Sequence, residues 1–140
     1  MTVSFADDVE AVVGPILVKR GFVLDEIDDS IDEGGRPAAV VYYRSPDCKV
    51  QIYKSSREGN VNCMIAPAGA KNEFGPLDKS LQWHYLNEFS PAPDVPLEEL
   101  VKSVSYKAKT EREQLERVRD RIAEYYDDAC AGVLQKYRPT

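Results

Sequence analysis

The sequence of 140 residues lacks several features that would assign it to a class of protein. No hydrophobic run approaches the roughly 20 residues of a membrane-spanning helix. The N-terminus carries three acids before its first base, which is not the pattern of a signal peptide. Histidine occurs once, and the three cysteines show no CxxC spacing. We therefore expect a protein of the reducing cytoplasm, with no bound cofactor and no metal site.

Basic charge is also scarce. The chain has 24 acids and 18 bases, a net charge of −6, and a pI near 4.9. The excess is concentrated in residues 1–35, which hold nine acids and two bases. An acidic surface does not release counterions from phosphates and is repelled by anionic lipid. This excludes general nucleic-acid binding and docking on a membrane surface, and it favours a protein partner, most simply a basic one.

The last third of the chain has no proline between Leu97 and Tyr137, and a single glycine. Apolar residues recur there at helical spacing, in a column formed by Val101, Ala108, Leu115, Ile122 and Ala129. Residues 97–137 are therefore predicted to form a long amphipathic segment, either one helix or a helical hairpin. A helix of this length exceeds what the preceding domain covers, so a homodimer formed through residues 97–137 is an open alternative.

The first 90 residues predict a helix followed by a β-meander. Phe5 to Leu17 place apolar residues on one helical face, Gly14-Pro15 should interrupt the helix, and Gly21 should end it. Four alternating segments follow, separated by turn signals. They begin at Phe22, Ala38, Lys49 and Val61.

Residues 78–89 then suggest a short helix that contains Trp83. The predicted fold is a single α+β domain of residues 1–140, in which residues 1–90 form the core of helix and meander. Its elements are an N-terminal helix, a four-stranded antiparallel β-meander, a short Trp-containing helix and a long C-terminal amphipathic helix.

Six acids crowd into nine residues, at Asp25, Glu26, Asp28, Asp29, Asp32 and Glu33. A calcium loop that started at Asp28 would need glycine at Glu33 and glutamate at Ala39, so this motif fails. One interpretation is a solvated edge strand whose charge discourages edge-to-edge pairing. The other is an acidic surface that recognises a basic partner, and these six residues are the candidate partner-binding site.

No catalytic residue is predicted. His84 has aromatic neighbours and lacks the orienting partner and nucleophile that a general base needs, so we expect a surface or half-buried side chain. The cysteines are expected to be small buried hydrophobes. Asp127 and Asp128 precede Cys130 and disfavour its thiolate.

The order of these features resembles a class of small bacterial proteins, some of which are immunity proteins that neutralise toxins. The resemblance is carried by Gly21-Phe22 at the end of the first helix, by three meander strands and by the Trp83 to Phe89 segment, and it covers about residues 5–90. It implies a cytoplasmic protein that binds and blocks a toxin, and it transfers no functional residue.

Three functions are therefore weighed. The first is a non-enzymatic protein-interaction protein of the immunity type, acting through the acidic surface. The second is an assembly module that dimerises through residues 97–137. The third is a small enzyme that uses carboxylates with support from His84 or Tyr85.

Overall fold

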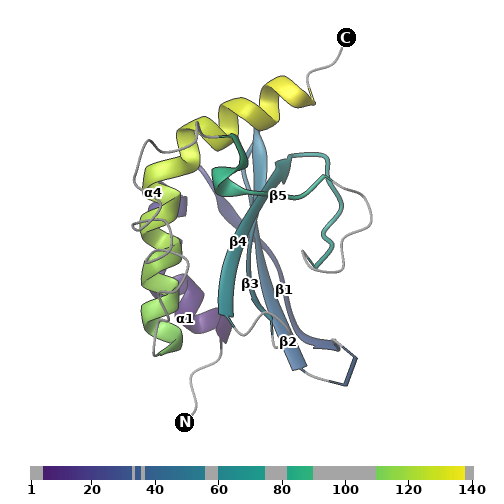
Figure 1. The fold of residues 1–140 in the computed structure, drawn as a ribbon, viewed down its shortest axis with the longest axis vertical. Helices are drawn as coiled ribbons and strands as arrows, with labels where there is room; N and C mark the ends of the chain where they lie inside the picture. Colours follow the sequence, from purple (N-terminus) through teal and green to yellow (C-terminus); the bar gives the residue numbers. More distant parts are fainter. Residues whose placement is uncertain are drawn as a thin grey trace, which may run out of the picture.

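A computed structural model describes residues 5–32, 34–35, 37–55, 60–74, 82–89 and 110–137. The fold is α+β, with an antiparallel sheet whose strands follow one another in chain order (Figure 1). The strands are β1 (Val23–Asp32), β2 (Pro37–Arg44), β3 (Cys48–Ser55), β4 (Asn60–Pro67) and β5 (His84–Tyr85). The helices are α1 (Phe5–Val12), α2 (Gly14–Lys19), the 3-10 turn η2 (Leu86–Phe89) and α4 (Glu111–Lys136).

The N-terminal helical segment is interrupted where the sequence predicts. α1 ends at Val12 and α2 begins at Gly14, because Pro15 has no N–H with which to continue the hydrogen-bond ladder. Gly21 adopts a φ of 86° and ends α2, a conformation that glycine reaches without steric cost.

The sheet has five strands among the described residues, so the prediction of four strands is wrong by one. β5 pairs antiparallel with β4 through Met64↔Tyr85 and Ile65↔His84. A two-residue strand shows no alternation of its own, which is why the sequence pattern does not reveal it.

The predicted Trp-containing helix is also corrected. Trp83 lies in a non-helical stretch before β5, and among residues 82–89 helical structure is limited to the single turn of η2. The apolar spacing that suggested a helix instead places Trp83 and Leu86 in different cores. Residues 78–81 of that prediction lie outside the described residues.

The long C-terminal helix is confirmed over Glu111–Lys136. Thr110 caps it, because the Thr110 side chain accepts a hydrogen bond from the Glu113 N–H at 3.0 Å. Residues 97–109 of the predicted segment lie outside the described residues. No helix in the described part of the chain is long and apolar enough to cross a membrane.

The apolar face of α4 is buried within its own domain. Its buried residues face the sheet and α1, and they are Leu115, Val118, Ile122, Ala129 and Val133. The Lys54 ammonium pairs with Glu111 at 2.7 Å, and the Gln114 side chain accepts from the Val61 N–H at 2.6 Å. These contacts tie the start of α4 to β3 and β4.

Both faces of the sheet are covered over β2, β3 and β4. The helices pack on one face, against residues that include Val41, Val50 and Ile52 (Figure 1). The other face holds a second apolar cluster, in which Val40, Tyr42, Tyr53 and Met64 pack against Phe74 and Trp83. The clean alternation of β3 therefore separates two cores, rather than a core from solvent.

Candidate functional site

The acidic segment forms one edge of the sheet. Five of the six candidate residues lie in β1, which occupies the end position in the strand order, and the sixth, Glu33, lies outside the described residues. Nearly every residue of β1 is exposed. The structure thus brings the candidate acids of β1 onto one strand, but it gives them different surroundings.

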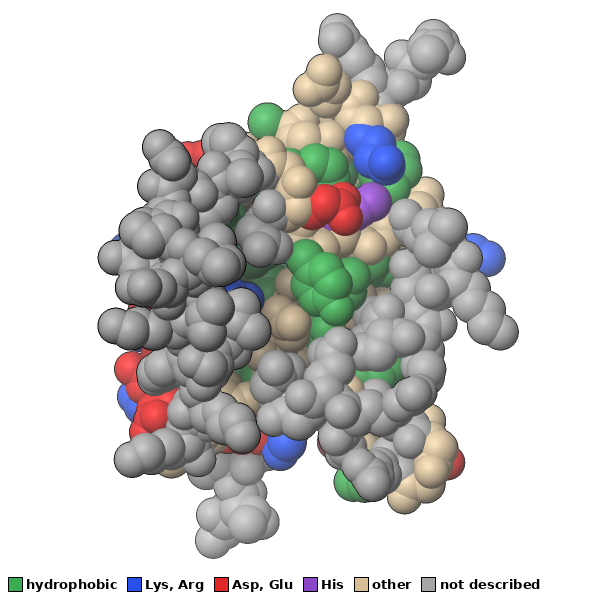
Figure 2. Space-filling view, in the orientation of Figure 1, with side chains coloured by type: hydrophobic (Ala, Val, Ile, Leu, Met, Phe, Trp, Pro, Cys, Tyr) green, Lys and Arg blue, Asp and Glu red, His purple; other side chains and the backbone are tan. Residues whose placement is uncertain are grey.

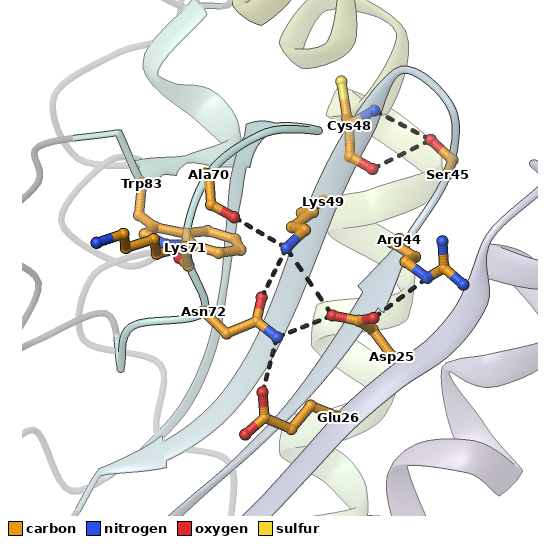
Figure 3. A network of polar contacts seen from close by, with 10 residues as sticks. All are labelled: Asp25, Glu26, Arg44, Ser45, Cys48, Lys49, Ala70, Lys71, Asn72 and Trp83. Carbon is orange, nitrogen blue, oxygen red and sulfur yellow. Dashed lines mark hydrogen bonds and ion pairs between the residues drawn. The ribbon is translucent and has the colours of Figure 1, made fainter.

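Asp25 and Glu26 are engaged within the protein. The Asp25 carboxylate lies 3.1 Å from Arg44 Nε and 3.9 Å from Lys49 Nζ, and its side chain keeps only 22% of its exposure. Asn72 Nδ2 donates to Asp25 and to Glu26, at 2.8 Å in each case (Figure 3). These two acids hold the loop after β4 against the sheet, so they are less available to a partner than the sequence suggests.

Lys49 is the centre of this contact network. Its ammonium donates to the Ala70 carbonyl at 2.8 Å and to Asn72 Oδ1 at 3.1 Å (Figure 3). Gln51 Nε2 donates to the Glu73 carbonyl at 2.9 Å, and Trp83 Nε1 donates to the Lys71 carbonyl at 3.0 Å. Two side chains of β3 and that of Trp83 thereby satisfy the backbone carbonyls of residues 70, 71 and 73, which lie outside the strands. The network explains how an irregular loop covers the second apolar cluster.

Asp28 and Asp32 make local turn contacts. Asp28 Oδ1 accepts from the N–H of Ser30 at 3.1 Å and from its hydroxyl at 3.2 Å, and Asp32 accepts from the Gly35 N–H. Asp29 is exposed, and its side chain makes no hydrogen bond or ion pair with another described residue. The outer part of β1 therefore carries two exposed acids, Asp29 and Asp32, and the half-buried Asp28, none of them neutralised by a basic side chain of the described chain.

Apolar side chains accompany these acids. Val23, Leu24 and Ile27 of β1 are 54%, 41% and 44% exposed, and Val18 of α2 is 64% exposed. The pairing of β1 with β2 is irregular at two places, between Leu24 and Glu26 and between Asp28 and Ile31. Irregularities and charge both restrict the pairing of an edge strand with another copy of itself.

A second cluster surrounds His84, for which the sequence predicts a surface or half-buried side chain on a helix. That expectation is wrong, because His84 lies in β5 and is buried, at 8% exposure. Its Nδ1 lies 2.5 Å from a Glu88 carboxylate oxygen, and its Nε2 lies 2.7 Å from the Tyr137 hydroxyl. The histidine is visible in purple beside an acidic side chain on the face drawn in Figure 2.

This cluster has the order of an acid–base relay, since a carboxylate orients a histidine that contacts a hydroxyl. The Phe89 ring meets the imidazole edge-on, with ring centroids 5.3 Å apart. The polar side chains that contact His84 are Glu88 and Tyr137, so its ring nitrogens are both occupied by the chain itself. These contacts join β5 and η2 to the end of α4. We therefore interpret the cluster as a structural link between these elements.

Sequence reasoning missed this cluster for an identifiable reason. The spacing of four residues between His84 and Glu88 is a signal that the sequence contains. Tyr137 is 53 positions from His84, and only the tertiary fold brings it close. Among the described residues, no group of three or more His, Cys, Asp or Glu side chains is arranged to hold a metal ion.

Comparison of the chain with protein-family models, with curated proteins and with solved structures finds no match.

Proposed function

We propose that this protein is a protein-interaction protein that binds a basic partner through the outer edge of β1. The observation that carries the proposal is the combination, on one edge strand, of the exposed acids Asp29 and Asp32, the half-buried Asp28 and three exposed apolar side chains. The outer β1 surface is defined here as Asp28, Asp29 and Asp32 with Val23, Leu24 and Ile27. Such a surface offers apolar contact area beside negative charge that no basic side chain of the described residues neutralises.

The most concrete form of this function is that of a bacterial immunity-type protein acting in the cytoplasm. A toxin that acts on an anionic substrate has a basic cleft, and an acidic edge strand would occupy that cleft and exclude the substrate. Opposite charges would raise the association rate and make it sensitive to salt. The exposed side chains of Leu24 and Ile27 would instead slow dissociation, because their burial is favourable and independent of salt.

The two acids that hold the loop after β4 are left out of the binding surface. Asp25 and Glu26 already accept from Asn72, and Asp25 also faces Arg44. Replacing them would disturb the fold together with the charge. A test of binding should therefore change the acids on the outer part of the strand.

Affinity capture with charge-matched variants tests the proposal. The surface variant is Asp28→Asn, Asp29→Asn, Asp32→Asn, in which each amide keeps a side-chain oxygen that accepts the local turn contacts. The control variant changes three exposed acids of α4, and it is Asp120→Asn, Glu124→Gln, Asp127→Asn. Each variant takes the net charge from −6 to −3. The variants lose the same number of charges at different positions, and the control also loses the exposed ion pair between Arg119 and Asp120.

Wild type and the control variant should retain one stoichiometric basic protein from a lysate of the source organism at low salt, and moderate salt should release it. The surface variant should lose that protein at both salt concentrations. Equal capture by the surface variant and wild type would contradict the proposed surface.

Self-assembly remains a second proposal with a narrower basis. Over the described part of residues 97–137, the apolar stripe is buried against the protein's own sheet, and Leu134, at 45% exposure, is the large apolar side chain of α4 that stays exposed. A dimer that uses α4 would have to form around Leu134. A monomeric mass by light scattering at high protein concentration, unchanged by Leu134→Ser, would count against it.

A further inference from the structure

Two of the three cysteines come together although they are 82 positions apart in the chain. The Sγ atoms of Cys48 and Cys130 lie 3.5 Å apart, while both residues are free thiols. Cys48 is the first residue of β3, and Cys130 lies in the last third of α4. The contact therefore joins the sheet to the helix that covers it.

Turn and helix fix the backbone of both cysteines. The backbone of Cys48 is fixed by the preceding turn, in which its N–H donates to Ser45 Oγ at 3.1 Å and its carbonyl accepts from the Ser45 hydroxyl at 3.1 Å (Figure 3). The Cys48 carbonyl also accepts from the Ser45 N–H at 2.8 Å. Cys130 follows the buried Ala129 within a continuous helix. A disulfide has an S–S length of about 2.0 Å, so the sulfurs need to approach by about 1.5 Å, which is within reach of side-chain rotation.

The two sulfurs differ in access. Cys48 is fully buried, whereas Cys130 is half-buried. A soluble reagent therefore reaches Cys130 first, and the Cys48 thiol lies within contact distance of the Cys130 sulfur. This is the arrangement of an attacking and a resolving thiol, in which one sulfur is exposed to the oxidant and the other closes the bond.

We propose that Cys48 and Cys130 form an oxidisable dithiol site, which a small-molecule disulfide such as oxidised glutathione converts into a disulfide between β3 and α4. The Cys130 thiolate attacks one sulfur of oxidised glutathione, and the first glutathione leaves and takes up a proton. The Cys48 thiolate then attacks the Cys130 sulfur and releases the second glutathione. The protein loses two electrons and two protons, and oxidised glutathione becomes two molecules of reduced glutathione.

The second step should be slow at neutral pH. Burial raises the pKa of the Cys48 thiol, and its hydrogen bond to Cys130 and the negative charge of Asp47 raise it further. Tyr126, on the helix packed against the pair, has its own pKa raised by burial and by its hydrogen bond to Cys130, so it stays neutral and supplies no charge that favours a thiolate. Because the pKa lies above the working range, the thiolate fraction of Cys48, and with it the closing rate, should rise about tenfold per unit of pH between 7 and 9.

Cys63 provides the matched control. It is also buried, and its Sγ contacts the Met64 carbonyl, with no sulfur contact among the described residues. Burial raises the pKa of the Cys63 thiol as well. Cys63→Ser therefore removes a buried thiol and leaves the proposed pair intact.

Reduced full-length protein is incubated with oxidised glutathione, then alkylated in denaturant and examined by intact mass and peptide mapping. Wild type should lose two of its three alkylatable thiols and give a Cys48–Cys130 peptide. Cys63→Ser should give the same linked peptide, and Cys48→Ser should stop at a glutathione adduct on Cys130. The proposal is overturned if wild type ends as that same adduct, or if the disulfide found includes Cys63. The decisive result is the peptide map of oxidised wild type, so the test does not depend on whether any variant folds.

Discussion

A substitution at Gly132 sets two effects of α4 against each other. Glycine in a helix interior is less favourable than alanine by about 1 kcal/mol, so Gly132→Ala would stabilise an uncrowded helix. In this fold, however, Gly132 faces Phe89 of η2. A Cβ atom placed there would overlap Cγ and Cδ1 of the Phe89 ring and would lie 2.7 Å from the Phe89 Cβ. Carbon atoms in favourable contact are about 3.5–4.0 Å apart.

The overlap is not removed by turning the ring alone, because the Phe89 Cβ is fixed to the backbone of η2. The turn must shift, and overpacking of this kind costs about 1–3 kcal/mol. Against the gain of about 1 kcal/mol in helix propensity, we expect Gly132→Ala to lower the free energy of unfolding by up to about 2 kcal/mol.

Urea unfolding of four proteins measures the effect as a double-mutant cycle: wild type, Gly132→Ala, Phe89→Ala and the double variant. In the Phe89→Ala background the overlap with the ring is gone and only the contact with the Cβ of residue 89 remains, so Gly132→Ala should be less destabilising than it is in wild type. Ala131→Gly, at the exposed neighbouring position, should lose about 1 kcal/mol and calibrates the propensity alone. An equal stabilisation by Gly132→Ala in both backgrounds would refute the packing of α4 against η2.

Three further changes test other contacts. Lys49→Met should lower the free energy of unfolding by about 1–3 kcal/mol, because the Ala70 carbonyl and the Asp25 carboxylate lose the ammonium that they contact. Lys54→Met removes an exposed ion pair and should lower it by less than about 1 kcal/mol in the same urea assay. Burial raises the pKa of Tyr43 to about 12, so the stability that its neutral form contributes should be full below about pH 10 and lost as pH rises through 12; Tyr43→Phe should flatten this alkaline loss in thermal melts. Oxidation that joins Cys48 to Cys130 should add about 4.5 kcal/mol by constraining the unfolded chain; an unchanged urea midpoint would contradict it.

The local features of the fold could be predicted from the sequence because neighbouring residues determine them. The break at Pro15, the left-handed Gly21 and the alternation of β3 each depend on a few adjacent positions. The start of α4 at Thr110 was not predicted, although the cap consists of only Thr110 and Glu113. Apolar residues recur at helical spacing throughout residues 97–137, so the sequence pattern shows no helix boundary at Thr110.

The features that depend on distant contacts could not be predicted. β5 forms only because β4 offers an edge, and the second apolar cluster is buried only because Lys49 and Gln51 hold the loop after β4. The same limit applies to the candidate site. The sequence located the acidic segment, but it did not separate Asp25, which is engaged with Arg44, from the exposed Asp29.

We propose that the position of negative charge on the outer β1 surface, and not the total charge, drives binding to a basic partner. The direct measurement is the association rate constant of the captured partner with wild type and with the two charge-matched triple variants at low salt. We predict a fall of about tenfold or more for the variant of Asp28, Asp29 and Asp32, and little change for the α4 variant. Equal rate constants for the two variants would contradict it.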